Sequence, residues 1–268
     1  MSGGLTLRLT PVSALGSRRA LRLVERNVLV YRRGWAFLVT GFFEPFFYLL
    51  SIGLGLNGLV GQQLSIGGHA VTYATYIAPG LLASSAMNGA LFDATFNIFF
   101  KLKITKTYDA VLSTPLGVSD IALAELLWCL MRAGLYSGAF MVVMASLGYV
   151  LTPWAVLCYP AALLISFAFA SAGMAATSYM RSWQDFDRIS LAIIPLFLFS
   201  GTFFPLTVYR QGWLQLVVRC TPLYQGIDLV RCLDAGVFNW ALLGHASYLA
   251  AMGVAGLAIT GRRFAELL

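Results

Sequence analysis

Long apolar blocks constrain the fold of this chain more than any other feature. Most of them reach the roughly 20 residues that a helix needs to cross the hydrocarbon core of a bilayer. Apolar residues run together rather than alternating, which favours helices over the strands of a barrel. The sequence therefore predicts an all-α membrane protein with six transmembrane helices. The six blocks cover residues 35–59, 72–99, 118–147, 154–179, 189–205 and 239–260.

Composition supports this class. Of the 268 residues, 59% are hydrophobic and 11% are charged, whereas soluble domains carry about 25% charged residues. The first 34 residues hold seven arginines and no apolar run typical of a signal peptide, so we expect no cleavable signal. We divide the chain into a cytoplasmic segment, 1–34, and a transmembrane domain, 35–268.

Positive charge is distributed unevenly between the predicted loops. With six spans both termini share one side, which collects fourteen lysines and arginines against three (Arg210, Arg219 and Arg231) on the other. Loops rich in these residues stay in the cytoplasm. We expect a plasma (inner) membrane protein with both termini cytoplasmic, and interpret the net charge of +7 as a topology signal rather than a sign of nucleic-acid binding.

Residues 17–33 have the periodicity of an amphipathic helix. Its apolar face groups Leu21, Val24, Val28 and Tyr31, and a second face groups Arg18, Arg22, Arg26 and Arg33. Such a helix lies in the membrane interface, with its arginines toward lipid phosphates or a protein partner. A topology signal without further function explains the same pattern.

The polar segment KLKITKTYDAVLSTPLGVSD, residues 101–120, separates the second and third blocks. It predicts a short cytoplasmic helix with Tyr108, Val111 and Leu112 on one apolar face, ended by Thr114 and Pro115. An exposed apolar face on such a helix favours a groove on another protein. We interpret it as a docking element for a motor on a separate chain. The residues assigned to it are Lys106, Thr107, Tyr108, Asp109, Val111, Leu112 and Pro115.

Ionisable side chains within the predicted spans form a second candidate site. Such groups are costly in hydrocarbon and normally pair or line a polar path. One interpretation is a structural ion pair of Arg132 with Glu44 or Glu125, and the other is the lining of a translocation path. The residues are Glu44, Asp93, Glu125 and Arg132, with Asn88 and Asn97 adding a polar stripe to the second span.

The segment after the fifth block is too apolar for a solvated loop. Pro205 and Pro222 bracket a helical pattern that includes Trp213, and a second helical pattern follows. We expect two short helices that dip back into the membrane from the outer face. Cys220 and Cys232 would then face an oxidising compartment, where they could form a disulfide or remain free thiols.

No motif for an enzyme or a metal site accompanies these features. The chain lacks G-x-x-x-x-G-K-[ST], H-E-x-x-H and G-x-S-x-G, and its two histidines, His69 and His245, are not placed as a catalytic pair. We expect no catalytic residue, no metal and no cofactor in this chain.

Four stretches resemble the permeases of type-2 ABC transporters (type V exporter fold), in particular nodulation-type lipo-oligosaccharide and daunorubicin-type export permeases. They are RNVLVYRRGWAFLVTGFFEPFFYLLSIGLGLNGLVG (27–61), YIAPGLLASSAMNGALFDATF (76–96), KTYDAVLSTPLGVSDIALAELLWCLMRA (106–133) and SGTFFPLTVYRQGWLQLVVRCTPLYQGIDLVR (200–231). The resemblance implies contact with an ATPase over 18–33, including Arg22 and Arg26, and over 106–116. It also implies an extracellular gate over 205–233, with Pro205, Trp213, Pro222 and Tyr224.

By this resemblance the chain is the membrane subunit of an ATP-driven exporter, with a second permease copy and cytoplasmic ATPases that bind ATP and Mg. Its cargo would be an amphipathic glycolipid, a lipid-linked glycan or a hydrophobic drug. An ion-coupled carrier that uses Glu44, Asp93 and Arg132 is an alternative, although no inverted repeat of broken helices is evident. A third is a membrane anchor that transports nothing, which would tolerate loss of the intramembrane charges.

Overall fold

The computed structural model describes residues 14–32, 43, 46–51, 55, 64–66 and 68–268. Regular structure in these residues is helical except for one antiparallel hairpin, in which β1 (Leu64–Ile66) pairs with β2 (His69–Val71). Gly68 turns this hairpin with a φ of +86°, a conformation that glycine adopts without steric cost. The largely helical class is confirmed, and the hairpin is an addition that the sequence analysis missed.

The helices have the following bounds. They are α1 (Ala14–Arg32), α3 (Tyr73–Phe92), α4 (Thr107–Leu112), α5 (Val118–Ser146), α6 (Cys158–Tyr179), α7 (Asp185–Leu198), α8 (Gly212–Cys220), α9 (Pro222–Asp234) and α10 (Trp240–Leu267). Two π-helical turns, η1 (Asp93–Asn97) and η2 (Phe100–Ile104), extend α3, while the 3-10 turns η3 (Pro153–Leu157) and η4 (Leu206–Val208) precede α6 and α8.

Three helices in the described part of the chain are long and apolar enough to cross a membrane: α5, η3 with α6, and α10. The predicted block at 35–59 lies mostly outside the described residues, although 46–51 are helical. The fifth block differs from expectation, because α7 begins at Asp185 and ends at Leu198. Gly201, with a φ of +74°, turns the chain just beyond that end. The six-span layout stays a prediction.

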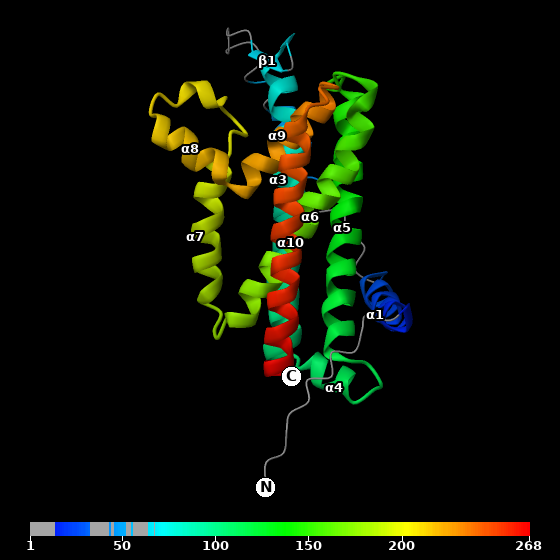
Figure 1. The fold of residues 1–268 in the computed structure, drawn as a ribbon. Coiled ribbons are helices and arrows are strands. Elements are labelled where there is room, and N and C mark those ends of the chain that lie inside the picture. The colour runs from blue at the N-terminus through cyan, green and yellow to red at the C-terminus, as the bar shows by residue number, and fades with distance from the viewer. Residues whose placement is uncertain (1–13, 33–42, 44–45, 52–54, 56–63, 67) are drawn as a thin grey trace.

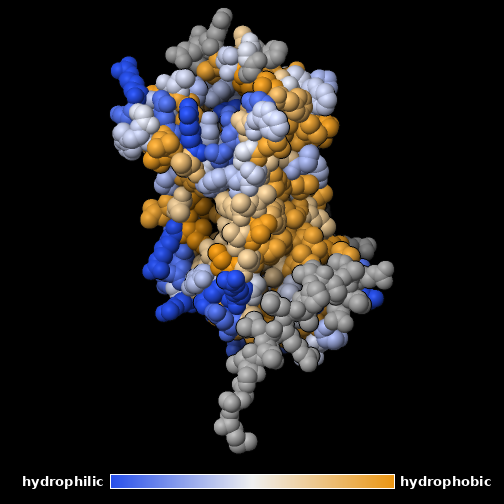
Figure 2. Space-filling view, viewed as in Figure 1, coloured by the Kyte–Doolittle hydropathy of each residue, from blue (hydrophilic) through white to orange (hydrophobic). Residues whose placement is uncertain are grey.

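Helix α3 occupies the centre of the bundle (Figure 1), with fourteen of its twenty residues buried. It packs against α5, α6 and α9, and α10 packs along α6. We call the end that carries α1, α4 and the C-terminus of α10 the basic end, and the end that carries β1, β2, α8 and α9 the hairpin end. Figure 2 shows an apolar belt between these two more polar ends, as expected where lipid replaces water.

Glycine allows a close backbone contact between α10 and α6. A Cβ atom built on Gly256 of α10 would lie 2.7 Å from the backbone carbon of Ser171 and 2.8 Å from the backbone nitrogen of Ala172, both on α6. Backbone atoms cannot move aside as a flexible side chain can. Small residues are used in this way at helix contacts in membranes, where close van der Waals packing drives association.

We expect Gly256→Ala to destabilise the fold by about 1–3 kcal/mol, the usual cost of overpacking. Thermal stability of the detergent-solubilised protein would measure this loss. Gly244→Ala is the matched control on the same helix, because its Cβ would meet no atom within 4 Å. The control should be neutral or stabilising, by up to about 1 kcal/mol. Equal stability of the two variants would contradict this account of the contact.

Candidate functional site

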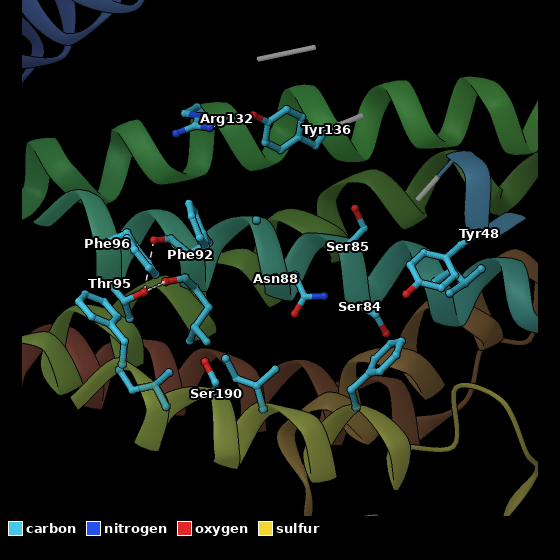
Figure 3. A pocket seen from close by; sticks show the side chains of 17 residues that line it. Tyr48, Ser84, Ser85, Asn88, Phe92, Thr95, Phe96, Arg132, Tyr136 and Ser190 are labelled. Atoms are coloured by element: carbon cyan, nitrogen blue, oxygen red, sulfur yellow. Dashed lines mark hydrogen bonds between the residues drawn. The ribbon is translucent and has the colours of Figure 1, made fainter. Parts of the chain in front are cut away.

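A cavity of about 560 Å³ opens between α3, α5 and α7 and forms the candidate functional site (Figure 3). Its lining divides by chemistry. Ser84, Ser85 and Asn88 line it from α3, and Ser190 lines it from α7, on the side toward which Ser84 and Asn88 point. Asn88, predicted as part of a polar stripe, therefore lines the cavity, whereas Asn97 at the end of η1 is half-buried elsewhere. The site offers hydroxyl and amide groups inside an apolar bundle.

Aromatic rings line the part of the cavity nearer the basic end. Phe92 and Phe96 stack with ring centroids 4.6 Å apart, and Phe96 stacks on Phe186 of α7 at 4.2 Å. Trp183 packs edge-on against Phe96 at 5.3 Å. Offset and edge-to-face pairs of this kind add to the stability gained from burial alone. The cavity thus joins a polar region to an aromatic one.

A buried ion pair includes Arg132, which lines the cavity. Arg132 of α5 donates a hydrogen bond to Oδ1 of Asp93, the first residue of η1, and another to the hydroxyl of Tyr136 at 2.8 Å. Arg132 and Asp93 are both nearly inaccessible to solvent. The structural interpretation of these charges is thus supported, with Asp93 as a partner of Arg132.

The expected pairing of Arg132 with Glu125 is wrong. Both residues lie on α5, seven positions apart, which separates them by about 10 Å along the helix axis. Side chains that meet on one helix are three or four positions apart. Glu44, the other expected partner, lies outside the described residues.

Glu125 pairs instead with a residue that the sequence analysis counted only toward topology. Lys101 Nζ, on η2, lies 2.8 Å from both carboxylate oxygens of Glu125 and 3.5 Å from Oδ1 of Asn27 on α1. Asn27 and Glu125 are buried. This cluster joins α1, η2 and α5 at the basic end. The sequence signal for this pairing was the place of Glu125 within a predicted apolar span, where a carboxylate needs a cation nearby.

Sequence comparisons with known proteins identify the family of this chain. A profile of the family described as ABC-2 type transporter matches residues 19–233. The chain belongs to this family. It is 34% identical over 225 residues to nodulation protein J of Rhizobium leguminosarum bv. trifolii, covering 82% of this chain and 83% of that protein. For nodulation protein J of Rhizobium meliloti (strain 1021) the identity is 33% over 216 residues, covering 79% of each chain. For that of Neorhizobium galegae it is 32% over 225 residues, covering 82% of this chain and 80% of that protein.

In this membrane permease the predicted docking helix exists as α4, but its apolar face is not exposed. Tyr108 and Val111 are buried within the chain, in a cluster that includes Leu23 of α1 and Phe264 of α10. The Tyr108 and Phe264 ring centroids lie 6.2 Å apart. The expectation of an exposed Tyr108 and Val111 is therefore wrong, because the bundle supplies the groove that these side chains need. They hold α4 in place rather than meet a partner.

The exposed face of α4 is polar. Asp109 and Ala110 are exposed, and Lys106, Ser113, Thr114 and Pro115 are exposed beside them, while Thr107 and Leu112 are half-buried. Lys106 adopts a φ of +47° before the first residue of α4. This conformation is uncommon for a residue other than glycine. The chain is thus sharply redirected between η2 and α4.

Helix α1 exists as predicted, with its faces slightly rotated. Ala20, Leu23 and Asn27 are buried against the bundle, and Val24 packs at the edge of that contact. The predicted apolar residues Leu21 and Val28 are exposed instead, as are Arg22 and Arg26. An exposed apolar and basic surface suits a helix that lies in the membrane interface.

The two helices predicted between the fifth and sixth blocks are present as α8 and α9. Pro222 is the first residue of α9, where its missing N–H costs nothing, and Pro205 precedes η4. Trp213 is 68% exposed on α8, whereas Tyr224 lines a second cavity of about 220 Å³ at the hairpin end. Cys220 and Cys232 are free thiols.

Arg231 holds this outer region to the bundle, a role that the sequence analysis missed. Its guanidinium donates hydrogen bonds to the carbonyl oxygens of Gly201 at 2.8 Å and Thr202 at 3.1 Å, and lies 4.0 Å from the centre of the Tyr76 ring on α3. Arg231 was counted as one of three charges on the outer side. Its place in PLYQGIDLVRCL, among the apolar residues of a short helix, was the available signal.

The Arg132–Asp93 pair can be tested by a double-mutant cycle. We expect Arg132→Met or Asp93→Leu alone to cost roughly 3–5 kcal/mol, because each removes one half of a buried ion pair. The double variant should regain a large part of that loss. The folded yield on size-exclusion chromatography is the measurement, and Lys103→Met, at an exposed lysine on η2, is the control. Additive losses would contradict the coupling.

Proposed function

We propose that this permease is the membrane subunit of an ATP-driven exporter for an amphipathic lipid-linked glycan, glycolipid or lipo-oligosaccharide. It would pair with a second permease copy or a homologous permease, and with separate cytoplasmic ATPases that bind ATP and Mg. The observation that carries the proposal is the cavity between α3, α5 and α7, because hydroxyl and amide groups and aromatic rings meet in it.

The chemistry of the cavity suits a cargo with two kinds of surface. Ser84, Ser85, Asn88 and Ser190 can exchange hydrogen bonds with sugar hydroxyls in place of water. Aromatic rings accept both sugar faces and acyl chains, and Phe92 and Phe96 are accompanied there by aliphatic side chains of α7. A hydrophobic drug would use the aromatic region and leave the polar groups unpaired, at a cost. A glycolipid therefore fits better.

Force from the ATPase would enter at the basic end. α4 presents an exposed polar face beside the exposed arginines of α1, and its buried face joins α1, α5 and α10 in one apolar cluster. From α4 the chain leads back through η2 and η1 to Thr95 and Phe96, which line the cavity, and to Asp93, which pairs with Arg132 of the cavity wall. π-helical turns are frequent at functional sites. A displacement of α4 would in this way reach the cavity.

The cavity can be filled from within to test the pathway. We expect Ser190→Trp to reduce cargo transport at least tenfold, because an indole at this position occupies the space between α3 and α7. Transport by the reconstituted exporter is the measurement, with ATPase binding unchanged. Leu191→Trp is the matched control, since Leu191 neighbours it on α7, is 72% exposed and does not line the cavity. Unimpaired transport by Ser190→Trp would refute the pathway.

Docking of the ATPase can be tested on the exposed face of α4. We expect Asp109→Arg with Ala110→Arg to lower ATPase copurification about tenfold, because bulk and charge enter a tight interface. Folded yield should stay normal, as neither residue is buried. Ser146→Arg, exposed at the far end of α5, is the control. Normal copurification would argue against docking at α4.

Transport under a pH gradient without any ATPase would instead favour an ion-coupled carrier.

A further inference from the structure

A chain of polar contacts links three helices at the hairpin end. The Gln225 side chain on α9 donates from Nε2 to the carbonyl oxygen of Arg219 in the last turn of α8, at 2.6 Å. Its Oε1 is hydrogen-bonded to Nδ1 of His245 on α10. The other ring nitrogen of His245, Nε2, lies 3.2 Å from Oδ2 of Asp228 on α9. His245 thus stands between two groups of α9.

Both ring nitrogens of His245 face acceptors. The carbonyl oxygen of Arg219 can only accept, which requires the Gln225 amide nitrogen to point toward it and the amide oxygen toward His245. The carboxylate of Asp228 is an acceptor as well. A neutral imidazole has one N–H and can serve one of them, whereas the imidazolium ion has two N–H groups and serves both. The complete set of contacts therefore requires the protonated ring.

These contacts matter because α8 has little apolar attachment. Val218 is the one buried residue among Gly212–Cys220, and Trp213, Leu216 and Val217 are all more than half exposed. The last turn of a helix leaves carbonyl groups without partners in the helix. Gln225 satisfies that of Arg219, and the hydroxyl of Tyr248 on α10 donates to that of Cys220 at 2.9 Å.

We propose that His245 is a pH-sensitive latch that, through Gln225, fastens α8 to α9 and α10 when its ring is protonated and loosens α8 when the ring is neutral. Histidine is the side chain whose charge ordinarily changes between about pH 5 and 8. The His245 and Asp228 side chains are 13% and 35% exposed, so the pair lies at the surface of the bundle rather than sealed in its interior.

Among the residues that the structure describes, Asp228 is the one titratable group that contacts the His245 ring directly through a charged side chain. Asp228 faces the ring from α9, and beyond it Arg231 and Tyr224 line the second cavity. Arg219 belongs to α8 and Tyr248 to α10 itself, while α6 contributes no charged side chain. Asp228 is therefore the anion that pairs with the protonated His245 ring. Acidification at the hairpin end should tighten the attachment of α8, and alkaline conditions should weaken it.

Hydrogen exchange of the full-length protein in lipid nanodiscs tests the latch without any transport measurement. The rate for residues 212–220 is compared at pH 8 and pH 5.5 in the native protein and in His245→Gln, which keeps a polar side chain that cannot become charged. Taking the ratio of the two proteins at each pH removes the intrinsic pH dependence of exchange. Residues 118–146 of α5 serve as an internal reference.

Relative to His245→Gln, we expect the native protein to protect α8 about tenfold more strongly at pH 5.5 than at pH 8. This is the effect of one hydrogen bond to a charged group. Asp228→Asn should abolish the pH dependence as His245→Gln does, and it carries the test if His245→Gln does not fold. His69→Gln is the matched control at the other histidine of the chain and should behave as the native protein. A ratio that is constant with pH, or pH dependence that disappears in His69→Gln, would overturn the proposal. Because the readout is local exchange, failure of the latch is distinct from failure of the proposed export function.

Discussion

Pairing of cations within an apolar bundle is the constraint on which the arrangement around α3 depends. A charge placed in a low-dielectric interior loses its hydration, and that loss must be offset by an opposite charge or by well-placed hydrogen bonds. In the described part of the chain Arg132 meets this need with Asp93, and Lys101 meets it with Glu125. Arg231 uses two backbone carbonyl groups and the face of Tyr76.

Each of these cations links α3, or the π-helical turns that extend it, to its neighbours at a different position along the bundle axis. Lys101 ties η2 to α5 and α1 at the basic end, and Arg132 ties η1 to α5 beside the cavity. Arg231 ties α9 and the turn after α7 to the start of α3 at the hairpin end. Apolar packing alone is non-directional, so these polar contacts add specific positions along the helix axes. These contacts therefore fix the positions of the cavity wall and of the outer helices relative to α3.

The sequence predicts helix α4 correctly, but it does not predict which face of that helix is exposed. Helical spacing correctly grouped Tyr108 and Val111 on one face, but periodicity cannot say what covers that face. In the folded chain Leu23 and Phe264, far apart in the sequence, arrive to cover it. What remains exposed is the polar side with Asp109, so a partner at this helix would meet charge and small residues rather than an apolar ridge.

The amino-acid sequence alone predicts that a membrane surrounds this protein and that its fold is helical. It also predicts the positions of α5, α6 and α10 and the presence of α1, α4, α8 and α9. These follow from local properties: the length of an apolar run, its period, and the positions of proline and glycine. The pairing of Arg132 with Asp93, the pairing of Lys101 with Glu125, and the position of His245 between Gln225 and Asp228 become visible only in the folded chain. Such contacts join residues up to 39 positions apart, and they depend on helix rotation and depth, which the packing of neighbouring helices sets. A local pattern can state that a buried charge needs a partner, but the partner is chosen by which helices lie side by side.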